Sequence, residues 1–171
     1  MLVAASGAML GSQRKEAAMP RITTTIEIGR PRQETFAYLT DPRNALEWST
    51  ELVDVTYNGD LTEGTTGSDT RKMGGKTLVM PWTVTSYERP ERIVFEYGRP
   101  FPATAEFSFR PTDDGTLVTC DTDLRPRGWW RLLAPLMVRE ARKADQIQFQ
   151  KVKEILEARP RRVSSEERET A

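Results

Sequence analysis

Arg71 and Tyr97 are the residues of this sequence best suited to act on a bound molecule. A guanidinium can anchor or polarise a carbonyl or carboxylate, and a phenol can donate to the same oxygen. Other chemistry is restricted, because the 171 residues contain no histidine and a single cysteine, Cys120. Ser-His-Asp and Cys-His sites are therefore excluded, and a metal could be held only by oxygen ligands. We expect neither a metal nor a cofactor.

Composition limits the partners and the compartment. The length fits one domain with a single core. Lys and Arg number 25, as do Asp and Glu, so the chain as a whole has no charge excess that favours phosphate backbones or acidic lipid. We therefore expect no nucleic-acid partner. The single cysteine excludes an intrachain disulfide and suits a reducing, cytoplasmic compartment.

The two ends of the chain differ from its middle. Residues 1–18 are small and mildly apolar, with no basic residue before the apolar part, and are too short to cross a bilayer. We expect them to be a disordered extension, with translation starting at either Met1 or Met19. The folded domain is predicted to span 19–158, and 159–171 to form a disordered charged tail. No integral membrane segment is expected.

The residues that could do chemistry need elements to position them, and the first of these is a strand at 22–28. Ile and Thr alternate there with a period of two, which is typical of a half-buried strand. Pro31 then suits the first turn of a helix that ends at Asp41-Pro42. A second short helix is predicted from Arg43 to about Trp48.

Strand patterns dominate from Leu52 onward. Gly74-Gly75 is the clearest signal of a two-residue hairpin, and Asn58-Gly59 is another turn. No helix interrupts this region, so a parallel βαβ sheet is excluded. We predict an antiparallel meander of six strands at 52–57, 69–73, 78–87, 93–97, 103–109 and 117–124.

A long amphipathic helix is predicted at 129–156, with Pro135 either in its first turns or at the start of its regular part. Its apolar line is large at one end and small in the middle, at Ala141 and Ala144. We expect a curved sheet under such a helix to leave a gap that side chains cannot fill completely. The line consists of Leu133, Met137, Ala141, Ala144, Gln148, Val152 and Ile155.

Strand parity separates an inner from an outer face. If Phe95, Tyr97, Phe107 and Phe109 look toward the long helix, the strand carboxylates look mostly away from it. Those carboxylates are Glu27, Glu96, Glu106, Asp121 and Asp123. The polar residues left inside are Thr24, Tyr57, Tyr97, Cys120, Thr122 and Gln148, with Arg71 or Asp69 as further candidates.

Two motifs carry a family resemblance. The segment from Pro31 to Trp48 (PRQETFAYLTDPRNALEW) resembles the opening motif of the SRPBCC superfamily, and 82–95 (WTVTSYERPERIVF) looks like its central one. The superfamily includes START-type lipid-transfer domains, birch-pollen-allergen-like proteins, and polyketide cyclases and aromatases. The resemblance implies an α+β helix-grip fold, with a seven-stranded curved antiparallel sheet around a long C-terminal helix and two short helices after the first strand. It also implies a deep cavity for an apolar or aromatic molecule.

The residues predicted to line that cavity are mostly aromatic or small. Packing offers a simpler interpretation of Trp48 and Trp82 as core aromatics, and of Cys120 as a small buried hydrophobe. Arg71, Arg139, Arg142 and Lys143 can be interpreted as solvated residues. The predicted ligand-binding residues are Trp48, Arg71, Trp82, Phe95, Tyr97, Phe107, Phe109, Met137, Ala141 and Ala144.

Three functions remain open. The first is binding, for carriage or sequestration, of a small hydrophobic or aromatic molecule such as a lipid or polyketide. The alternative is a polyketide cyclase or dehydratase, in which Arg71 or Tyr97 polarises a carbonyl and a buried acid serves as base. The missing histidine weakens the enzyme hypothesis, because a carboxyl group that acts as base would need a strongly raised pKa. The third is a protein-interaction domain resembling the Hsp90-activator branch. Charges and prolines around Arg99-Pro100 protect a strand edge, which favours a monomer or weak homodimer.

Overall fold

A computed structural model describes residues 21–73, 75–128 and 130–160. The extension predicted at 1–18, and residues 161–171 of the tail predicted at 159–171, lie outside these described residues. The elements are, in chain order, β1 (Arg21–Ile28), α1 (Arg32–Thr40), a 3-10 turn η1 (Pro42–Asn44), α2 (Ala45–Trp48), β2 (Leu52–Tyr57), β3 (Thr66–Met73), β4 (Lys76–Glu88), β5 (Arg92–Tyr97), β6 (Ala103–Pro111), β7 (Thr116–Leu124) and α3 (Trp130–Ala158).

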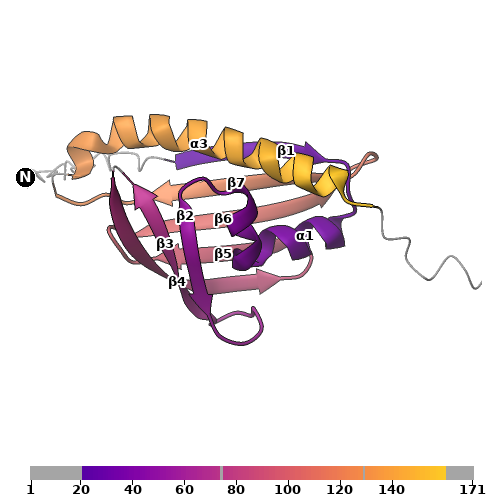
Figure 1. The fold of residues 1–171 in the computed structure, drawn as a ribbon, viewed down its shortest axis with the longest axis horizontal. Coiled ribbons are helices and arrows are strands. Elements are labelled where there is room, and N and C mark those ends of the chain that lie inside the picture. Colours follow the sequence, from indigo (N-terminus) through magenta and orange to yellow (C-terminus); the bar gives the residue numbers. More distant parts are fainter. Residues whose placement is uncertain (1–20, 74, 129, 161–171) are drawn as a thin grey trace, which may run out of the picture.

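The seven strands form one antiparallel sheet in the order β1-β7-β6-β5-β4-β3-β2. The first strand pairs with the last, and every other neighbour is joined by a hairpin or short loop, as the meander predicts. Figure 1 shows this curved sheet with α3 running along β1 and the short helices beside it. The predicted α+β helix-grip fold is confirmed. Among the described residues, no helix has the length and apolar character needed to span a bilayer.

The interior holds two apolar clusters. The first lies under the C-terminal half of α3, where Phe149, Val152 and Leu156 pack against α1 and the strands β1, β6 and β7. The second lies on β4 and β5 and is built from Trp82, Val84, Ile93 and Phe95. Aromatic contacts join the two clusters. The Phe107 ring centroid lies 6.4 Å from that of Phe95 and 6.4 Å from that of Phe149.

The C-terminal end of α3 is fixed to the junction between β1 and α1. Arg30 is only 4% exposed, and its guanidinium donates to the carbonyl oxygens of Leu156 and Glu157, each at 2.8 Å, and of Arg159. The last carbonyls of a helix have no partner within the helix, so these bonds cap it. The backbone N–H of Gly29 also donates to Glu157 at 2.8 Å.

The N-terminal end of α3 is much less covered. A helix of 29 residues is about 43 Å long, whereas a strand of eight residues is about 26 Å long, so α3 outreaches β1. Leu133, predicted on the inward line, is 39% exposed, and that part of the prediction is wrong for this reason. The helix also begins at Trp130 and contains Pro135, rather than beginning at the proline.

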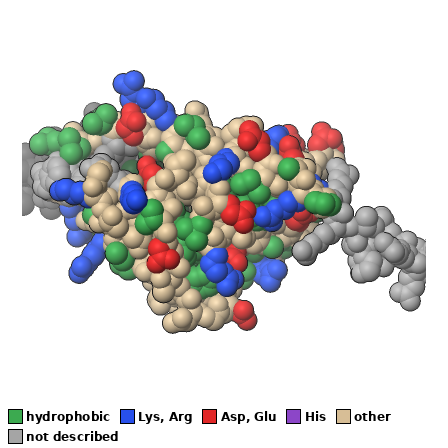
Figure 2. All heavy atoms as spheres, in the orientation of Figure 1, with side chains coloured by type: hydrophobic (Ala, Val, Ile, Leu, Met, Phe, Trp, Pro, Cys, Tyr) green, Lys and Arg blue, Asp and Glu red, His purple; other side chains and the backbone are tan. Residues whose placement is uncertain are grey.

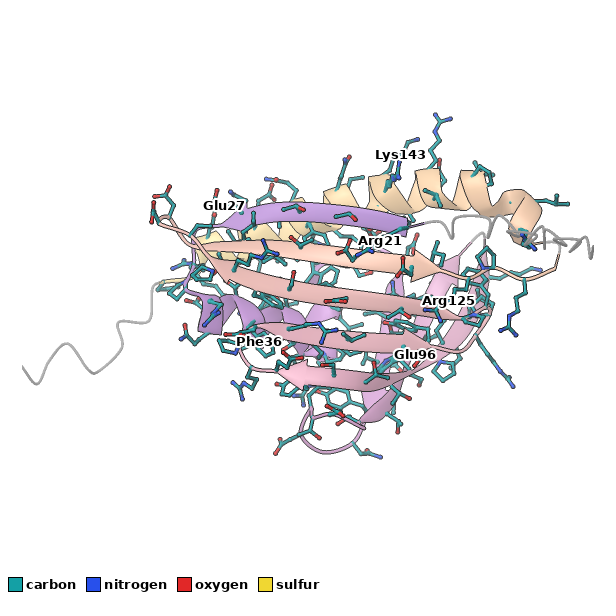
Figure 3. All side chains as sticks on the ribbon, turned by 180° about the vertical axis from the view of Figure 1, so that it is seen from behind. Arg21, Glu27, Phe36, Glu96, Arg125 and Lys143 are labelled. Carbon is teal, nitrogen blue, oxygen red and sulfur yellow. The ribbon has the colours of Figure 1, made fainter. Side chains whose placement is uncertain are left out.

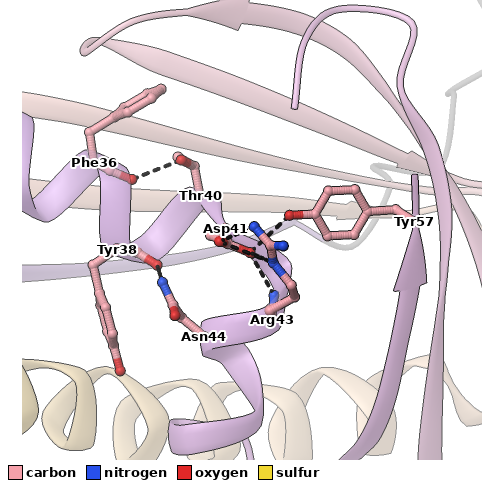
Figure 4. Close-up of polar contacts among 7 residues, drawn as sticks. All are labelled: Phe36, Tyr38, Thr40, Asp41, Arg43, Asn44 and Tyr57. Atoms are coloured by element: carbon pink, nitrogen blue, oxygen red, sulfur yellow. Dashed lines mark hydrogen bonds and ion pairs between the residues drawn. The ribbon is translucent and has the colours of Figure 1, made fainter. Parts of the chain in front are cut away.

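An acidic side chain holds the short helices to the sheet edge. Asp41 caps η1 by accepting from the backbone N–H of Arg43 at 3.0 Å, and it accepts from the Tyr57 hydroxyl of β2 at 3.0 Å (Figure 4). Burial raises the pKa of Asp41, but the hydrogen bonds from Arg43 and Tyr57 outweigh it and lower the pKa below its ordinary value. The break between the two short helices, which the Asp41-Pro42 pattern predicts, is therefore held to β2 by this hydrogen bond.

Candidate functional site

Asp69 is the centre of a buried polar cluster on β3. Asp69 is only 4% exposed, and its carboxylate accepts hydrogen bonds from Trp82 Nε1 at 2.9 Å and from Arg71 Nη2 at 2.9 Å. Asp69 and Arg71 share a face because they are two residues apart on one strand. Trp82 reaches across from β4 because it pairs with Gly67, where a Cβ atom would overlap the indole ring.

Tyr97 closes the cluster from β5, where it pairs with Trp82. Burial and the neighbouring charge of Asp69 raise the pKa of the Tyr97 phenol, and Arg71 offsets part of this rise. Burial lowers the pKa of Arg71, but Tyr97 and Asp69 outweigh it and raise the pKa overall. The strands therefore present a charged guanidinium and a protonated phenol side by side. Both can donate to a carbonyl or hydroxyl oxygen.

Asp145 faces this cluster from α3. Its carboxylate accepts from the Thr24 hydroxyl of β1 at 3.4 Å, and it interacts electrostatically with Arg71. Burial raises the pKa of Asp145 above its ordinary value, although Thr24 and Arg71 lower part of it. An acid with a raised pKa opposite hydrogen-bond donors is an arrangement often found at functional sites.

Cys120 on β7 interacts electrostatically with Tyr97 and Asp145 but is not reactive. Burial raises the pKa of its thiol to about 12, and its sulfur lies 3.8 Å from the Thr122 hydroxyl. The thiolate form is negligible at neutral pH, so Cys120 behaves as a small buried hydrophobe. Among the described residues, no three acidic or sulfur side chains converge on a point that could hold a metal ion.

The predicted lining residues fall into two groups. Trp82, Phe95 and Phe107 form a wall beside the polar cluster, with ring centroids 5.4 Å apart for Trp82 and Phe95. Trp48 and Phe109 instead pack in the cluster under the C-terminal half of α3. The structure therefore brings together Arg71, Tyr97, Trp82, Phe95 and Phe107, and leaves Trp48 and Phe109 apart from them.

The residues predicted to form the helix side of the site are small. Ala141 and Ala144 are half-buried, and Gln148 is buried one turn further on. The side chain of Met137 lies outside the described residues. An open depression on α3 lies elsewhere, lined by Gln146, Ile147, Gln150, Lys151 and Glu154, away from the polar cluster.

The outer face of the sheet carries most of the strand carboxylates, as parity predicts. Glu96 is exposed (Figure 3). Glu106 accepts from Arg92 at 2.7 Å. Asp69 is the exception, because it is buried on the inner face. Asp69 was already a candidate for the inner face, and the register of the β3–β4 hairpin agrees, since it sets Asp69 opposite Met80 and on the same face as Trp82. Asp145 was missed because the predicted inward line passed through its neighbour Ala144.

Replacing Asp145 is expected to stabilise the protein. The raised pKa means that the folded state binds the carboxyl proton more tightly than the unfolded chain, so stability falls as pH rises from the unfolded-state pKa through the folded-state pKa. We expect Asp145→Asn to raise the free energy of unfolding at neutral pH and to make no difference in acid. Urea unfolding across pH measures this, with exposed Asp54→Asn as control. A loss of stability at neutral pH would show that the carboxylate is paired rather than strained.

Comparison with known proteins gives one family and a common fold. The family described as polyketide cyclase / dehydrase and lipid transport matches residues 19–157. A comparison with curated protein sequences finds no match. A protein from Thermus thermophilus has a similar structure, with a TM-score of 0.69 at 15% identity, over 82% of this chain and 100% of its own.

Two further solved structures are similar at comparable levels. A protein from Nitrosomonas europaea aligns with a TM-score of 0.65 at 17% identity, over 83% of this chain and 96% of its own. The di-domain ARO/CYC protein BexL from the BE-7585A biosynthetic pathway aligns with a TM-score of 0.68 at 16% identity, over 83% of this chain and 51% of BexL. At these identities the likeness shows the fold alone.

Proposed function

The chain belongs to the polyketide cyclase / dehydrase and lipid transport family of the SRPBCC superfamily, and from this premise we propose that it binds a small hydrophobic or aromatic molecule between its sheet and α3. The ligand is a lipid or polyketide-like compound that carries a carbonyl or hydroxyl group. The protein acts as its carrier or sequesters it.

The observation that supports this function is the polar cluster of Asp69, Arg71 and Tyr97 beside an aromatic wall. Asp69 engages Nε and Nη2 of Arg71, whose side chain is still 24% exposed. Such a guanidinium is held in place yet can reach a ligand oxygen. Ala141 and Ala144, which are predicted to face it from α3, would present little side-chain volume there, whereas the C-terminal half of α3 is tightly packed.

The energy of such binding comes mainly from apolar burial. Removing about 200 Å² of ligand surface from water contributes roughly 5 kcal/mol before the costs of association. One or two hydrogen bonds from Arg71 and Tyr97 then fix the orientation. We therefore expect affinity in the micromolar to millimolar range and tolerance of ligand shape.

Thermal unfolding with a panel of sterols, fatty acids, quinones, flavonoids and polyketides tests the proposal. At least one compound should raise Tm, because a ligand that binds only the folded state stabilises it. Tyr97→Phe should weaken that ligand by about fivefold and Arg71→Gln by about tenfold, as expected for one neutral and one charged hydrogen bond. Exposed Arg110→Gln is the matched control and should leave the affinity unchanged. The absence of any shift across the panel would count against binding.

Asp145 favours a second candidate, a cyclase or dehydratase. Its raised pKa makes it a stronger base than an ordinary carboxylate, and Arg71 lies close enough to interact with it electrostatically. A substrate carbonyl polarised by Arg71 and Tyr97 would acidify a neighbouring methylene group, whose proton Asp145 could accept. Asp145→Asn should then abolish turnover of a polyketide substrate while leaving its binding intact. Unchanged turnover in that variant would exclude this role.

A further inference from the structure

Three stretches of the chain meet at one end of the molecule. Tyr97 pairs with Trp82, so residues 76–81 of β4 and the hairpin before them extend past the end of β5. The backbone N–H of Arg125 donates to the Pro102 carbonyl at 2.9 Å, which places the β5–β6 loop beside the connection from β7 to α3. Figure 1 shows the hairpin and the beginning of α3 at the same end. We call the described residues of segments 72–79, 98–102 and 125–143 together the basic end.

The basic end concentrates positive charge in a chain that is neutral as a whole. It contains nine of the 25 Lys and Arg residues and one of the 25 Asp and Glu residues, which leaves 16 basic and 24 acidic residues for the rest of the chain. All nine basic residues are exposed. They are Lys72, Lys76, Arg99, Arg125, Arg127, Arg131, Arg139, Arg142 and Lys143.

The same end exposes large apolar side chains. Leu132 is 84% exposed, Leu136 is 58% exposed and Val79 is 61% exposed. Figure 2 shows hydrophobic and basic side chains together where α3 begins, and Figure 3 shows Arg125 and Lys143 toward this end, away from Glu27. Exposed leucines on a helix rich in Arg and Lys are the features of a segment that lies in a membrane interface.

We propose that the basic end docks onto the surface of an anionic lipid bilayer, with Leu132 and Leu136 entering the headgroup region. The charge selects this partner. A second copy of the chain would present the same positive end and be repelled. The phosphate backbone of a nucleic acid would not bury the exposed leucines. Basic residues near an anionic membrane surface each contribute to attraction, and buried leucines add to it.

Docking there would serve the proposed ligand site, and to that extent the inference rests on the proposed function. Tyr97 is the last residue of β5, and Arg71 lies two residues before the end of β3. Both therefore sit toward the basic end, so a docked protein would turn the polar cluster toward the bilayer. A lipid-soluble ligand could then pass between bilayer and protein without crossing water.

Vesicle flotation with the purified full chain tests the docking. The protein should float with vesicles of phosphatidylcholine and phosphatidylglycerol mixed in roughly a three-to-one ratio, should not float with phosphatidylcholine alone, and should be released by high salt. Leu132→Ser and Leu136→Ser should each lower the partition coefficient about tenfold, and Arg131→Gln about fivefold.

Matched controls lie on the same helix outside the basic end. Ile147 is 64% exposed and Lys151 is exposed, so Ile147→Ser and Lys151→Gln should float like the unaltered protein. The proposal is overturned if the anionic vesicles are not bound, or if the controls lose binding as much as the leucine variants. It is also overturned if light scattering shows a dimer that Leu136→Ser dissociates and vesicles are not bound.

Binding of anilinonaphthalene sulfonate without vesicles separates this inference from the proposed function. If probe binding depends on Tyr97 but flotation fails, the docking surface is wrong and the ligand site stands. If flotation depends on Leu132 and Leu136 but neither the probe nor any ligand binds in a Tyr97-dependent way, the docking surface stands and the ligand site is wrong.

Discussion

Asp69→Ala is expected to lower the free energy of unfolding by about 3 kcal/mol, because it leaves the Arg71 guanidinium and the Trp82 indole N–H without their buried partner. Urea unfolding followed by far-UV circular dichroism measures the loss. Exposed Asp54→Ala on β2 is the matched control, and it should change the free energy by no more than about 0.5 kcal/mol. A similarly small effect at Asp69 would show that water replaces its hydrogen bonds.

A double variant distinguishes the loss of a charge partner from a general loss of packing. Asp69→Leu with Arg71→Met removes both charges and keeps the side-chain volume, so it should be more stable than Asp69→Ala. If the double variant is less stable than the single one, packing around Trp82 rather than the unpaired charge explains the effect. Because Arg71 is predicted to contact the ligand, the double variant should bind it at least about tenfold more weakly.

Arg30→Met is expected to have an effect of similar size, about 3 kcal/mol, by removing charged hydrogen bonds to three carbonyl groups at the end of α3. Arg30→Lys should recover little of this, because one ammonium group cannot match the geometry of a guanidinium fork. The control is Arg32→Met, whose side chain makes only a 3.3 Å ion pair with exposed Glu91.

Hydrogen exchange locates the effect of Arg30→Met. Amides in the last turns of α3 should exchange faster, because their hydrogen bonds no longer end in a capped and docked helix terminus. Amides in β4 and β5, around Trp82 and Phe95, should keep their relative protection. A uniform increase across the sheet with no extra increase at the end of α3 would contradict the capping role.

The fold could be predicted because its signals are local and repeated. Alternation in the strands, the Gly74-Gly75 turn and the helical spacing of 129–156 each specify an element without reference to the rest of the chain. The hairpin register follows as well, since Met73 pairs with Lys76. Apolar residues that recur with a period of two indicate the strands, and apolar residues that recur with a period of 3.6 indicate the long helix. These two patterns were sufficient for the seven strands and the long helix.

The site could be predicted only in part, because it depends on contacts between distant elements. Parity placed Tyr97 on the inner face and left Arg71 and Asp69 as candidates. The bond from Trp82 to Asp69 depends on the space left by Gly67. Asp145 meets Thr24 only once α3 lies along β1. Spacing also placed Leu133 on the inward line, although helix length leaves it exposed. The ligand-binding role of the lining residues stays a prediction.

The two ends of α3 differ in a way that suits the proposed function. The C-terminal end is capped by Arg30 and packed through Leu156, whereas the N-terminal end carries exposed leucines. Because α3 is anchored at its C-terminal end, its N-terminal end can move without disrupting the core under the C-terminal half. Entry of a ligand at the less covered end would therefore leave the cluster under the C-terminal half intact.

Mass spectrometry of an organic extract of the natively purified protein tests the ligand site most directly. The account predicts that a hydrophobic or aromatic molecule co-purifies with the unaltered chain and is lost in Ala141→Phe, where the added ring would occupy the proposed ligand space between α3 and the sheet. Ile147→Phe adds a ring on the exposed side of α3 and should retain the molecule. Equal amounts in both variants, or no molecule above a mock purification in the unaltered protein, would contradict a ligand site between the sheet and α3.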